Sequence, residues 1–510
     1  MPQPDPAIVL CTLNAKYIHA SLGLRYLLAN MGGLSPQTVL REFTARRKPQ
    51  EMADELLALS PRVIGFGVYI WNVTETTTVV RLIKQARPDV KVVLGGPEVS
   101  HEWADQEAFQ LADHLITGWG DVSFPKLCQA LLYGPQPLMK VIAGEQPELE
   151  QITLPYEHYT DADLAHRLLY VEASRGCPFK CEFCLSSLDK TARAFPLDAF
   201  LVALDGLYQR GARNFKFVDR TFNLKIDASV RILQFFLDRM ADDLFVHFEV
   251  IPDHLPERLK VLIAQFPSGV LQLEVGIQTF NVDVQQRISR HQDNDKTVAN
   301  LVWLVERSQA HLHTDLIFGL PGESLESIAI GFDRLYAVHP HEIQLGLLKR
   351  LRGTPIARHT TAHGMVYDVH PPYTVLQTAA LDAATVQRLT RMARYWDMVA
   401  NSGRFKMTLP ALLQGESAFF AFLRWTDWLW NTSTKTQGLT PEALVDALFE
   451  YLTKHRDMPV DAVRATLLGD YVASGARAMP QCLRALLPRS HAPAQRDPAR
   501  PLAQRQGRHA

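Results

Sequence analysis

The sequence predicts an α/β protein in three parts: a doubly wound, Rossmann-like parallel sheet, a partial (β/α)6 barrel and an all-helical C-terminal region. Two series of short apolar runs, each separated by helical patterns, predict the two sheets, because strands that alternate with helices pair in parallel. The last third of the chain shows helical periodicity only. We expect the parts to cover residues 1–140, 165–360 and 370–487, followed by a disordered tail over 488–510.

In the first part, glycine-rich loops follow the predicted strands. Gly95-Gly96-Pro97 closes one strand, and Gly118-Trp119-Gly120-Asp121 closes the next. Doubly wound sheets bind ligands at the carboxyl ends of their strands, so these loops are candidate binding loops. The expected strands are Ile8–Thr12, Val63–Val68, Lys91–Leu94 and His114–Thr117, and the expected helices are Leu22–Met31 and Thr74–Ala86.

The second and third parts differ in their periodicity. Six βα units within about 190 residues favour a partial barrel over a small sheet. Its expected strands are Leu168–Ala173, Asn214–Val218, Phe245–Val250, Leu271–Gly276, His313–Phe318 and Glu342–Leu348. The helices expected after residue 370 are Leu376–Ser402, Leu409–Asn431, Pro441–His455 and Pro459–Ala473.

The composition is that of a soluble globular protein, with 47% apolar and 21% charged residues and a formal net charge of −1. No overall basic field argues for a nucleic-acid partner. No window approaches the roughly 18 apolar residues of a membrane span, and the N-terminus has no signal-peptide pattern. We therefore expect a cytoplasmic protein without a membrane span.

Three of the six cysteines lie close together, at Cys177, Cys181 and Cys184, in a C-x3-C-x2-C pattern after a predicted strand. Three thiolates on one loop can ligate three irons of a [4Fe–4S] cluster and leave the fourth iron open. Zinc is the competing metal. A structural zinc site needs four protein ligands, and neither a second cysteine pair nor a suitably spaced histidine is present.

The segment RGCPFKCEFC resembles the cluster loop of the radical S-adenosylmethionine (SAM) superfamily. This resemblance implies that Cys177, Cys181 and Cys184 hold a [4Fe–4S] cluster and that Phe183 packs near the adenine of SAM. The open iron would chelate SAM, and electron transfer would cleave it to methionine and a 5′-deoxyadenosyl radical.

Three further segments, FVDRTFN, LEVGIQT and DLIFGLPGE, resemble segments of the same barrel and follow in the same order. Glu274 and Gln278 interrupt an apolar strand, which is costly unless the two side chains find partners. The resemblance assigns cofactor contacts to Asp219, Glu274, Gly276, Gln278, Asp315 and Gly319.

The first 140 residues resemble the cobalamin-binding domain that precedes many radical SAM barrels, through HASLG, GFGVYIWN, LGGPEVS and TGWGD. The cobalt-ligating D-x-H-x-x-G motif is absent, so we expect cobalamin without a histidine cobalt ligand. The resemblance assigns cobalamin contacts to Val68, Asn72, Gly95, Gly96, Gly118 and Gly120.

The resemblance implies an oxygen-sensitive radical SAM enzyme that uses cobalamin and a reductant such as flavodoxin or ferredoxin. Methyl transfer to an unactivated carbon is one reaction, and cobalamin-assisted cyclisation or rearrangement, as in anaerobic porphyrin cyclases, is the other. A methylthiotransferase fits poorly, because the first part lacks the three extra cysteines of that class. An iron–sulfur electron relay or scaffold is the non-enzyme alternative. Arg350 and Arg352 are candidates for binding an anionic substrate.

Overall fold

A computed structural model of the protein describes residues 6–415, 417–476, 478–486 and 509. The expected tail over residues 488–510 lies outside this part of the chain, except for His509. The chain forms two compact units. The first comprises residues 1–248, 349–357 and 368–374, and the second comprises residues 249–348, 358–367 and 375–510.

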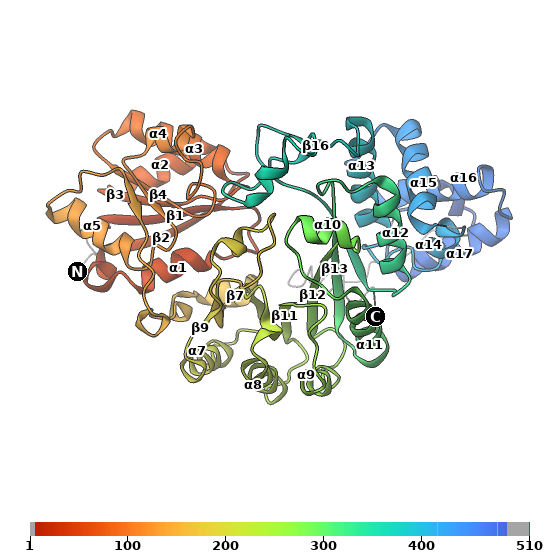
Figure 1. Ribbon diagram of the computed structural model, residues 1–510, viewed down its shortest axis with the longest axis horizontal. Coiled ribbons are helices and arrows are strands. Elements are labelled where there is room, and N and C mark those ends of the chain that lie inside the picture. The colour runs from red at the N-terminus through yellow and green to blue at the C-terminus, as the bar shows by residue number, and fades with distance from the viewer. Residues whose placement is uncertain (1–5, 416, 477, 487–508, 510) are drawn as a thin grey trace. The chain divides into compact units, whose positions relative to one another are not determined.

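The first unit opens with a six-stranded parallel sheet in the order β2-β1-β3-β4-β5-β6 (Figure 1). The doubly wound sheet was predicted, but β2 and β6 were not. The strands are β1 (Ile8–Asn14), β2 (Thr38–Thr44), β3 (Val63–Gly67), β4 (Lys91–Gly95), β5 (His114–Thr117) and β6 (Val141–Ala143).

Helices cover both faces of this sheet, as the burial of its strands requires. One apolar core joins the sheet to α2 (Pro49–Ala58), α3 (Val73–Ala86) and α4 (Glu107–Leu111). A second core, on the other face, joins it to α1 (Leu22–Ala29) and α5 (Ser123–Tyr133) (Figure 1). The central strands are buried on both faces, so their loops at the carboxyl edge are held by rigid elements.

The second sheet has six strands in the order β14-β13-β12-β11-β10-β7, which matches the predicted partial barrel. The strands are β7 (Leu169–Val171), β10 (Asn214–Phe217), β11 (Phe245–Val250), β12 (Leu271–Gln278), β13 (His311–Phe318) and β14 (Glu342–Leu347). The accompanying helices are α6 (Asp161–His166), α7 (Leu197–Gln209), α8 (Ile226–Leu237), α9 (Glu257–Ile263), α10 (Val282–Arg287), α11 (Asn294–Arg307) and α12 (Leu325–Tyr336).

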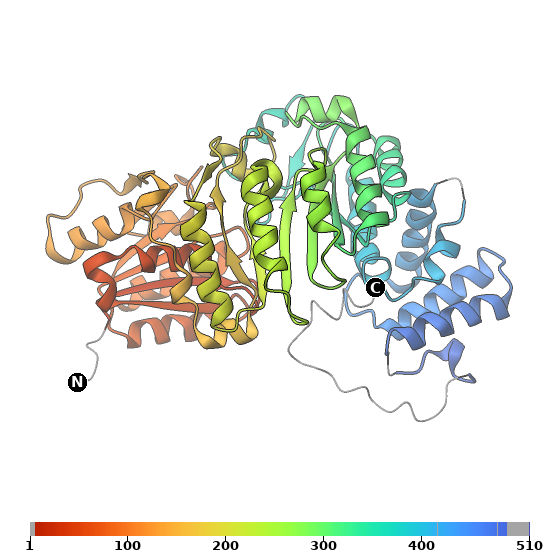
Figure 2. The ribbon, with the colours of Figure 1, turned by 90° about the horizontal axis from the view of Figure 1, so that it is seen from below.

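Aromatic side chains join the helices to these strands. The ribbons of α7 and α8, in yellow to yellow-green, run alongside the strands (Figure 2). In the first unit, Phe217 of β10 lies edge-on to Phe200 of α7 and Phe236 of α8, with ring centroids 5.9 and 6.1 Å apart. In the second unit, Phe332 of α12 meets Trp396 at 4.9 Å and Phe419 at 5.6 Å. Such pairs add to the apolar area that they bury.

The C-terminal helices are α13 (Ala383–Val399), α14 (Thr408–Leu413), α15 (Ala418–Ser433), α16 (Pro441–Lys454) and α17 (Val460–Ala473). The start of this region differs from the all-helical prediction, because β15 (Val366–Tyr367) and β16 (Val375–Gln377) form a short antiparallel pair before α13. The helix expected over residues 409–431 is divided into α14 and α15. None of the helices within the described ranges is long and apolar enough to span a membrane.

Gly96 provides a test of how the loop after β4 is held. Its φ is +106°, and an added Cβ would lie 2.5 Å from the carbonyl oxygen of Val68. Gly118 also has a positive φ, +73°, but an added Cβ would meet nothing within 4 Å. The two glycines therefore share the backbone constraint and differ in the space around them.

We predict that Gly118→Ala lowers the free energy of unfolding by about 1–2 kcal/mol, the cost of a left-handed backbone at an alanine. Gly96→Ala should cost a further ~1–3 kcal/mol, because Val68 must move. Urea denaturation of both metal-free variants measures the difference. Equal losses would contradict the close approach of Val68.

Candidate functional site

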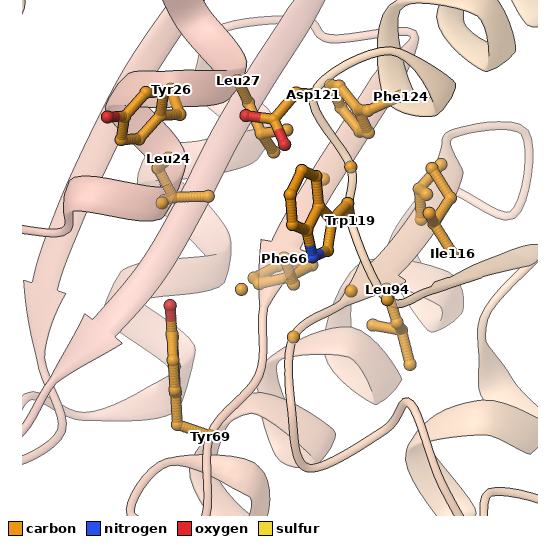
Figure 3. Close-up of a pocket in the computed structure, with 18 of the residues that line it drawn as sticks. Leu24, Tyr26, Leu27, Phe66, Tyr69, Leu94, Ile116, Trp119, Asp121 and Phe124 are labelled. Carbon is orange, nitrogen blue, oxygen red and sulfur yellow. The ribbon is translucent and has the colours of Figure 1, made fainter. Parts of the chain in front are cut away.

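A cavity of about 250 Å³ lies at the carboxyl edge of the first sheet (Figure 3). Loops after β3, β4 and β5 form it together with the start of α1. Its wall combines backbone with apolar and aromatic side chains. The lining residues include Leu24, Tyr26, Leu27, Gly65, Phe66, Gly67, Tyr69, Leu94, Gly95, Gly96, Ile116, Gly118, Trp119, Gly120, Asp121, Phe124 and Arg175.

The structure brings four of the predicted residues together in this wall: Gly95, Gly96, Gly118 and Gly120. Because glycine has no side chain, the cavity wall at these four points is main chain, and a ligand can approach it closely. An added Cβ at Gly120 would lie 3.0 Å from Leu27. A narrow, glycine-lined and largely apolar cavity suits the nucleotide tail of cobalamin.

Val68 and Asn72, which the sequence assigned to cobalamin, do not line the cavity. Val68 is fully buried. The amide of Asn72 donates to the carbonyl oxygen of Leu13 at 3.0 Å and accepts the N–H of Tyr69 at 2.8 Å. Both residues hold the loop after β3 in place.

The aromatic residues of the same loop lie within the segment Val68–Asn72, which the resemblance assigns to the corrin face, although they were not named one by one. Tyr69 lines the cavity, and its ring stacks on Trp71 at 4.5 Å with an interplanar angle of 8°. Trp71 is 49% exposed, which is unusual for so large an apolar side chain. An exposed, stacked indole beside a cavity offers a flat surface to a planar ligand.

His19 is not part of the cavity wall. Its Nδ1 lies 2.7 Å from the hydroxyl of Tyr170, and burial lowers its pKa. This partner gives His19 a structural role.

The three-thiol loop follows β7 and is closed by a short antiparallel pair, β8 (Ser174–Arg175) with β9 (Arg193–Ala194). The N–H of Cys177 donates to the carbonyl oxygen of Asp189 at 2.9 Å. Gly176 has a φ of +86°, and a Cβ there would collide with the carbonyl oxygen of Thr191. The backbone before the first thiol is therefore fixed.

The three thiols influence one another electrostatically. Burial, together with the charges of Cys181 and Cys184, raises the pKa of the Cys177 thiol to about 11. Among the described residues, no three His, Cys, Asp or Glu side chains are already arranged as a metal-ligand set. Three neighbouring thiols nevertheless match the donor chemistry of an iron–sulfur cluster, whose binding would replace their protons. Phe183 lies half-buried beside Cys184 in this loop.

Asp219, a predicted SAM contact, is bonded to the residues that lead into the three-thiol loop. Its Oδ2 accepts the N–H of Ala173 at 2.9 Å, and its Oδ1 accepts the hydroxyl of Ser174 at 2.6 Å. Burial raises the pKa of this carboxyl to about 7. These contacts give Asp219 a role in holding the loop.

The second unit carries the remaining predicted SAM contacts on adjacent strands. In the parallel register, Glu274 pairs with His313 and Gly276 pairs with Asp315. A bulge follows Gly276, and Gln278 has a φ of +70°. Strain of this kind at a non-glycine residue is typical of functional sites. Within the described chain, the Oε1 atom of Gln278 is buried and accepts no hydrogen bond.

Close packing explains why two positions of this unit, Gly276 and Gly319, carry no side chain. An added Cβ at Gly276 would lie 2.5 Å from Nε2 of Gln278. Gly319 has a φ of +85°, and its Cβ would lie 2.6 Å from Val375 of β16. Gly276 thus makes room for the Gln278 side chain, and Gly319 makes room for β16.

His313 of β13 was missed in the sequence, although it lies among three carboxylates. Its Nε2 is 3.5 Å from Asp315 Oδ1, and its Nδ1 is 3.6 Å from Glu342 Oε2. Glu274, its neighbour on β12, supplies the third negative charge. Burial lowers the pKa of His313, but its bond with Asp315 and the three carboxylates outweigh burial and raise it to about 9.

Arg350 and Arg352, the candidates for binding an anionic substrate, both pair with carboxylates of the first unit. Arg352 Nε donates to Glu98 Oε1 at 3.0 Å, and Arg350 donates to Glu102 Oε2 at 2.9 Å. Both acids follow β4. These ion pairs hold residues 349–357 against the loop after β4.

Arg175 belongs to both features of the first unit, since it lines the cavity and lies two residues before Cys177. Its guanidinium donates to both carboxylate oxygens of Asp121, at 2.9 and 3.2 Å. Its Nε donates to Glu172 at 2.7 Å. One side chain thus bonds the loop after β5 to the chain that leads into the thiols.

The raised pKa of His313 generates a pH prediction. A folded-state pKa of about 9, above the unfolded value, contributes stability below pH 6.5 that is lost as the pH rises through 9. We predict that His313→Gln lowers the free energy of unfolding by about 1–3 kcal/mol more at pH 6.5 than at pH 9.5.

Urea denaturation at both pH values measures this difference. His363→Gln is the control, because burial lowers the pKa of His363 and its titration falls below this range. A His313→Gln effect that is independent of pH would contradict the proposed charge state.

Family comparisons agree with the two cofactor regions. The B12 binding domain family matches residues 8–128, the radical SAM superfamily matches residues 171–330, and a protein family of unknown function, DUF4080, matches residues 361–506. The cofactors of the first two families are cobalamin and a [4Fe–4S] cluster with SAM.

The chain is 24% identical over 348 residues to the cobalamin-dependent radical SAM methyltransferase TokK of Streptomyces tokunonensis. The alignment covers 59% of this chain and 48% of TokK. It spans about half the length of the curated relatives that it matches.

Two solved structures share the fold. The radical SAM methyltransferase TsrM of Kitasatospora setae matches with a TM-score of 0.58 at 17% identity, over 74% of this chain and 80% of TsrM. The cobalamin-dependent SAM radical enzyme OxsB matches with a TM-score of 0.60 at 12% identity, over 91% of this chain and 78% of OxsB. These two likenesses show the fold, and the family matches show that the chain carries a B12-binding domain, then a radical SAM domain and then a DUF4080 region.

Proposed function

We propose that this protein is a cobalamin-dependent radical SAM methyltransferase that acts on an unactivated carbon. The observation that carries the proposal is the sharing of Arg175 by the glycine-lined cavity and the three-thiol loop within one compact unit. A chain that only relayed electrons would need the thiols but not the cavity.

In this proposal, the cluster supplies an electron for SAM cleavage and cobalamin carries the methyl group. Cys177, Cys181 and Cys184 hold the cluster, and Phe183 packs on the adenine. The unpartnered Oε1 of Gln278 and the carboxylates of Glu274 and Asp315 are assigned to SAM. The cavity takes the nucleotide tail of cobalamin, and the Tyr69–Trp71 stack meets the corrin. A flavodoxin- or ferredoxin-type reductant supplies the electron.

Methyl transfer is favoured over cyclisation by the relatives with the longer matches. TokK and the 2-(S-pantetheinyl)-carbapenam-3-carboxylate methyltransferase of Streptantibioticus cattleyicolor align over 59% and 58% of this chain. The anaerobilin synthase of Escherichia coli O157:H7 aligns over 18%. Cobalamin-assisted cyclisation or rearrangement is the second candidate, since the same two cofactors serve it.

Product analysis tests the proposal. We predict that the protein, reconstituted anaerobically with iron, sulfide and hydroxocobalamin, converts SAM in the presence of dithionite to both 5′-deoxyadenosine and S-adenosylhomocysteine. Loss of the methyl group from SAM leaves S-adenosylhomocysteine, and reductive cleavage leaves 5′-deoxyadenosine. Chromatography of the quenched reaction separates the two products.

Cys181→Ala should abolish 5′-deoxyadenosine, because the cluster loses a ligand. Cys482→Ala is the matched control, since Cys482 lies outside the three-thiol loop and should leave both products unchanged. If 5′-deoxyadenosine forms but S-adenosylhomocysteine does not depend on cobalamin, the cyclisation alternative replaces methyl transfer. If neither product forms on a stable cluster, the relay or scaffold alternative replaces both.

A further inference from the structure

Arg175 lies in a nearly closed ionic and aromatic environment inside the first unit. Its side chain is 13% exposed, and the acids that bind it, Asp121 and Glu172, are 7% and 11% exposed. The guanidinium carbon also lies 4.4, 4.9 and 5.5 Å from the ring centroids of Tyr26, Trp119 and Phe195. A planar cation suits this site, because it can bind carboxylates in fixed directions and stack on aromatic faces.

Three of these partners, Tyr26, Trp119 and Asp121, are also part of the cavity wall. Trp119 and Asp121 lie on the loop after β5, and Figure 3 shows both around the cavity with Tyr26 of α1. A ligand that fills the cavity must therefore order the side chains that bind Arg175. The second acid that binds Arg175, Glu172, lies on the chain that leads from β7 into the thiols.

The connection from Arg175 to the first thiol has little freedom. Only Gly176 separates Arg175 from Cys177, and the close approach of Thr191 fixes its backbone. The N–H of Cys177 is itself bonded to Asp189. A displacement of Arg175 is therefore transmitted to Cys177 and is not absorbed by a flexible linker.

The charges make the arrangement sensitive to loss of a partner. One guanidinium lies between two buried carboxylates, 2.9 Å from Asp121 and 2.7 Å from Glu172. Burial raises the pKa of Glu172, and Arg175 opposes this effect. Removal of one member from such a group leaves a buried charge without a partner, which is strongly unfavourable.

We propose that Arg175 is a positioning residue that couples binding of cobalamin in the cavity to assembly of the cluster on Cys177, Cys181 and Cys184. The inference rests on the proposed function, because it assumes that these two groups occupy the two sites. Coupling of this kind is reciprocal: cobalamin favours the cluster by the same factor by which the cluster favours cobalamin.

The test compares hydroxocobalamin affinity in two forms of the full chain, one with the reconstituted cluster and one from which chelation has removed the iron. Visible absorption during titration gives both dissociation constants. We predict that the cluster-loaded form binds roughly fivefold or more tightly, within the usual range of coupling between sites. A ratio near one in the wild type would overturn the coupling, and this comparison needs no variant.

Variants then assign the coupling to Arg175. Arg175→Lys keeps the charge but cannot bind both carboxylates with a planar fork, so its ratio of dissociation constants should fall below about twofold. Arg193→Lys is the matched control, since Arg193 pairs with Arg175 across the β8–β9 hairpin and lies 5.0 Å from the same Trp119 ring. It should keep the wild-type ratio.

The ratio of the two dissociation constants decides between the roles, because a merely structural defect weakens hydroxocobalamin binding to the cluster-loaded and iron-free forms alike. Circular dichroism of each variant checks the fold. A wild-type ratio in Arg175→Lys would overturn the role of this residue. Hydroxocobalamin that binds neither form of the wild type would overturn the proposed function as well, whereas tight but equal binding overturns the coupling alone.

Discussion

The organisation of the first unit depends on the ion pairs of Arg175, which bond a loop of the N-terminal sheet to the chain before the three thiols. Aromatic contacts, such as the stack of Tyr26 on Phe195 and the approach of Arg193 to Trp119, join the same two regions. Charge-assisted bonds in fixed directions are suited to this task, because they resist both rotation and separation. Asp219 holds the same chain as well, because its carboxylate accepts hydrogen bonds from Ala173 and Ser174.

The cavity and the three-thiol loop need different properties from the chain. The cavity wall needs glycines and aromatic rings, whose positions are set by a sheet that is buried on both faces. The thiols need a loop whose start is fixed but whose ligand geometry can adapt to the metal. The second unit adds a strained strand end at Gln278 and a histidine, His313, that lies among carboxylates which raise its pKa.

The sequence identified features that lie close together along the chain. The three thiols fall within one loop, and the glycines follow apolar runs that had to be strands. Contacts between distant segments were missed, because Asp121 and Arg175 meet across 54 positions and carry no shared pattern. Val68 and Asn72 were expected at the cofactor, but a fully buried valine and an amide bonded to Leu13 serve the loop itself. The strand β2 was missed because its sequence, TVLREFT, places two adjacent charged residues in its middle and so lacks a strand's alternation. β6 and β16 are only three residues long.

The central claim is that Cys177, Cys181 and Cys184 hold a four-iron cluster whose remaining iron is open to SAM. Electron paramagnetic resonance of the anaerobically reduced protein tests it most directly. The account predicts the signal of a reduced [4Fe–4S] cluster with g-values that change when SAM is added, since SAM binds the open iron. A reduced-cluster signal that is identical with and without SAM would contradict the account, because it would mean that the protein itself supplies the fourth ligand.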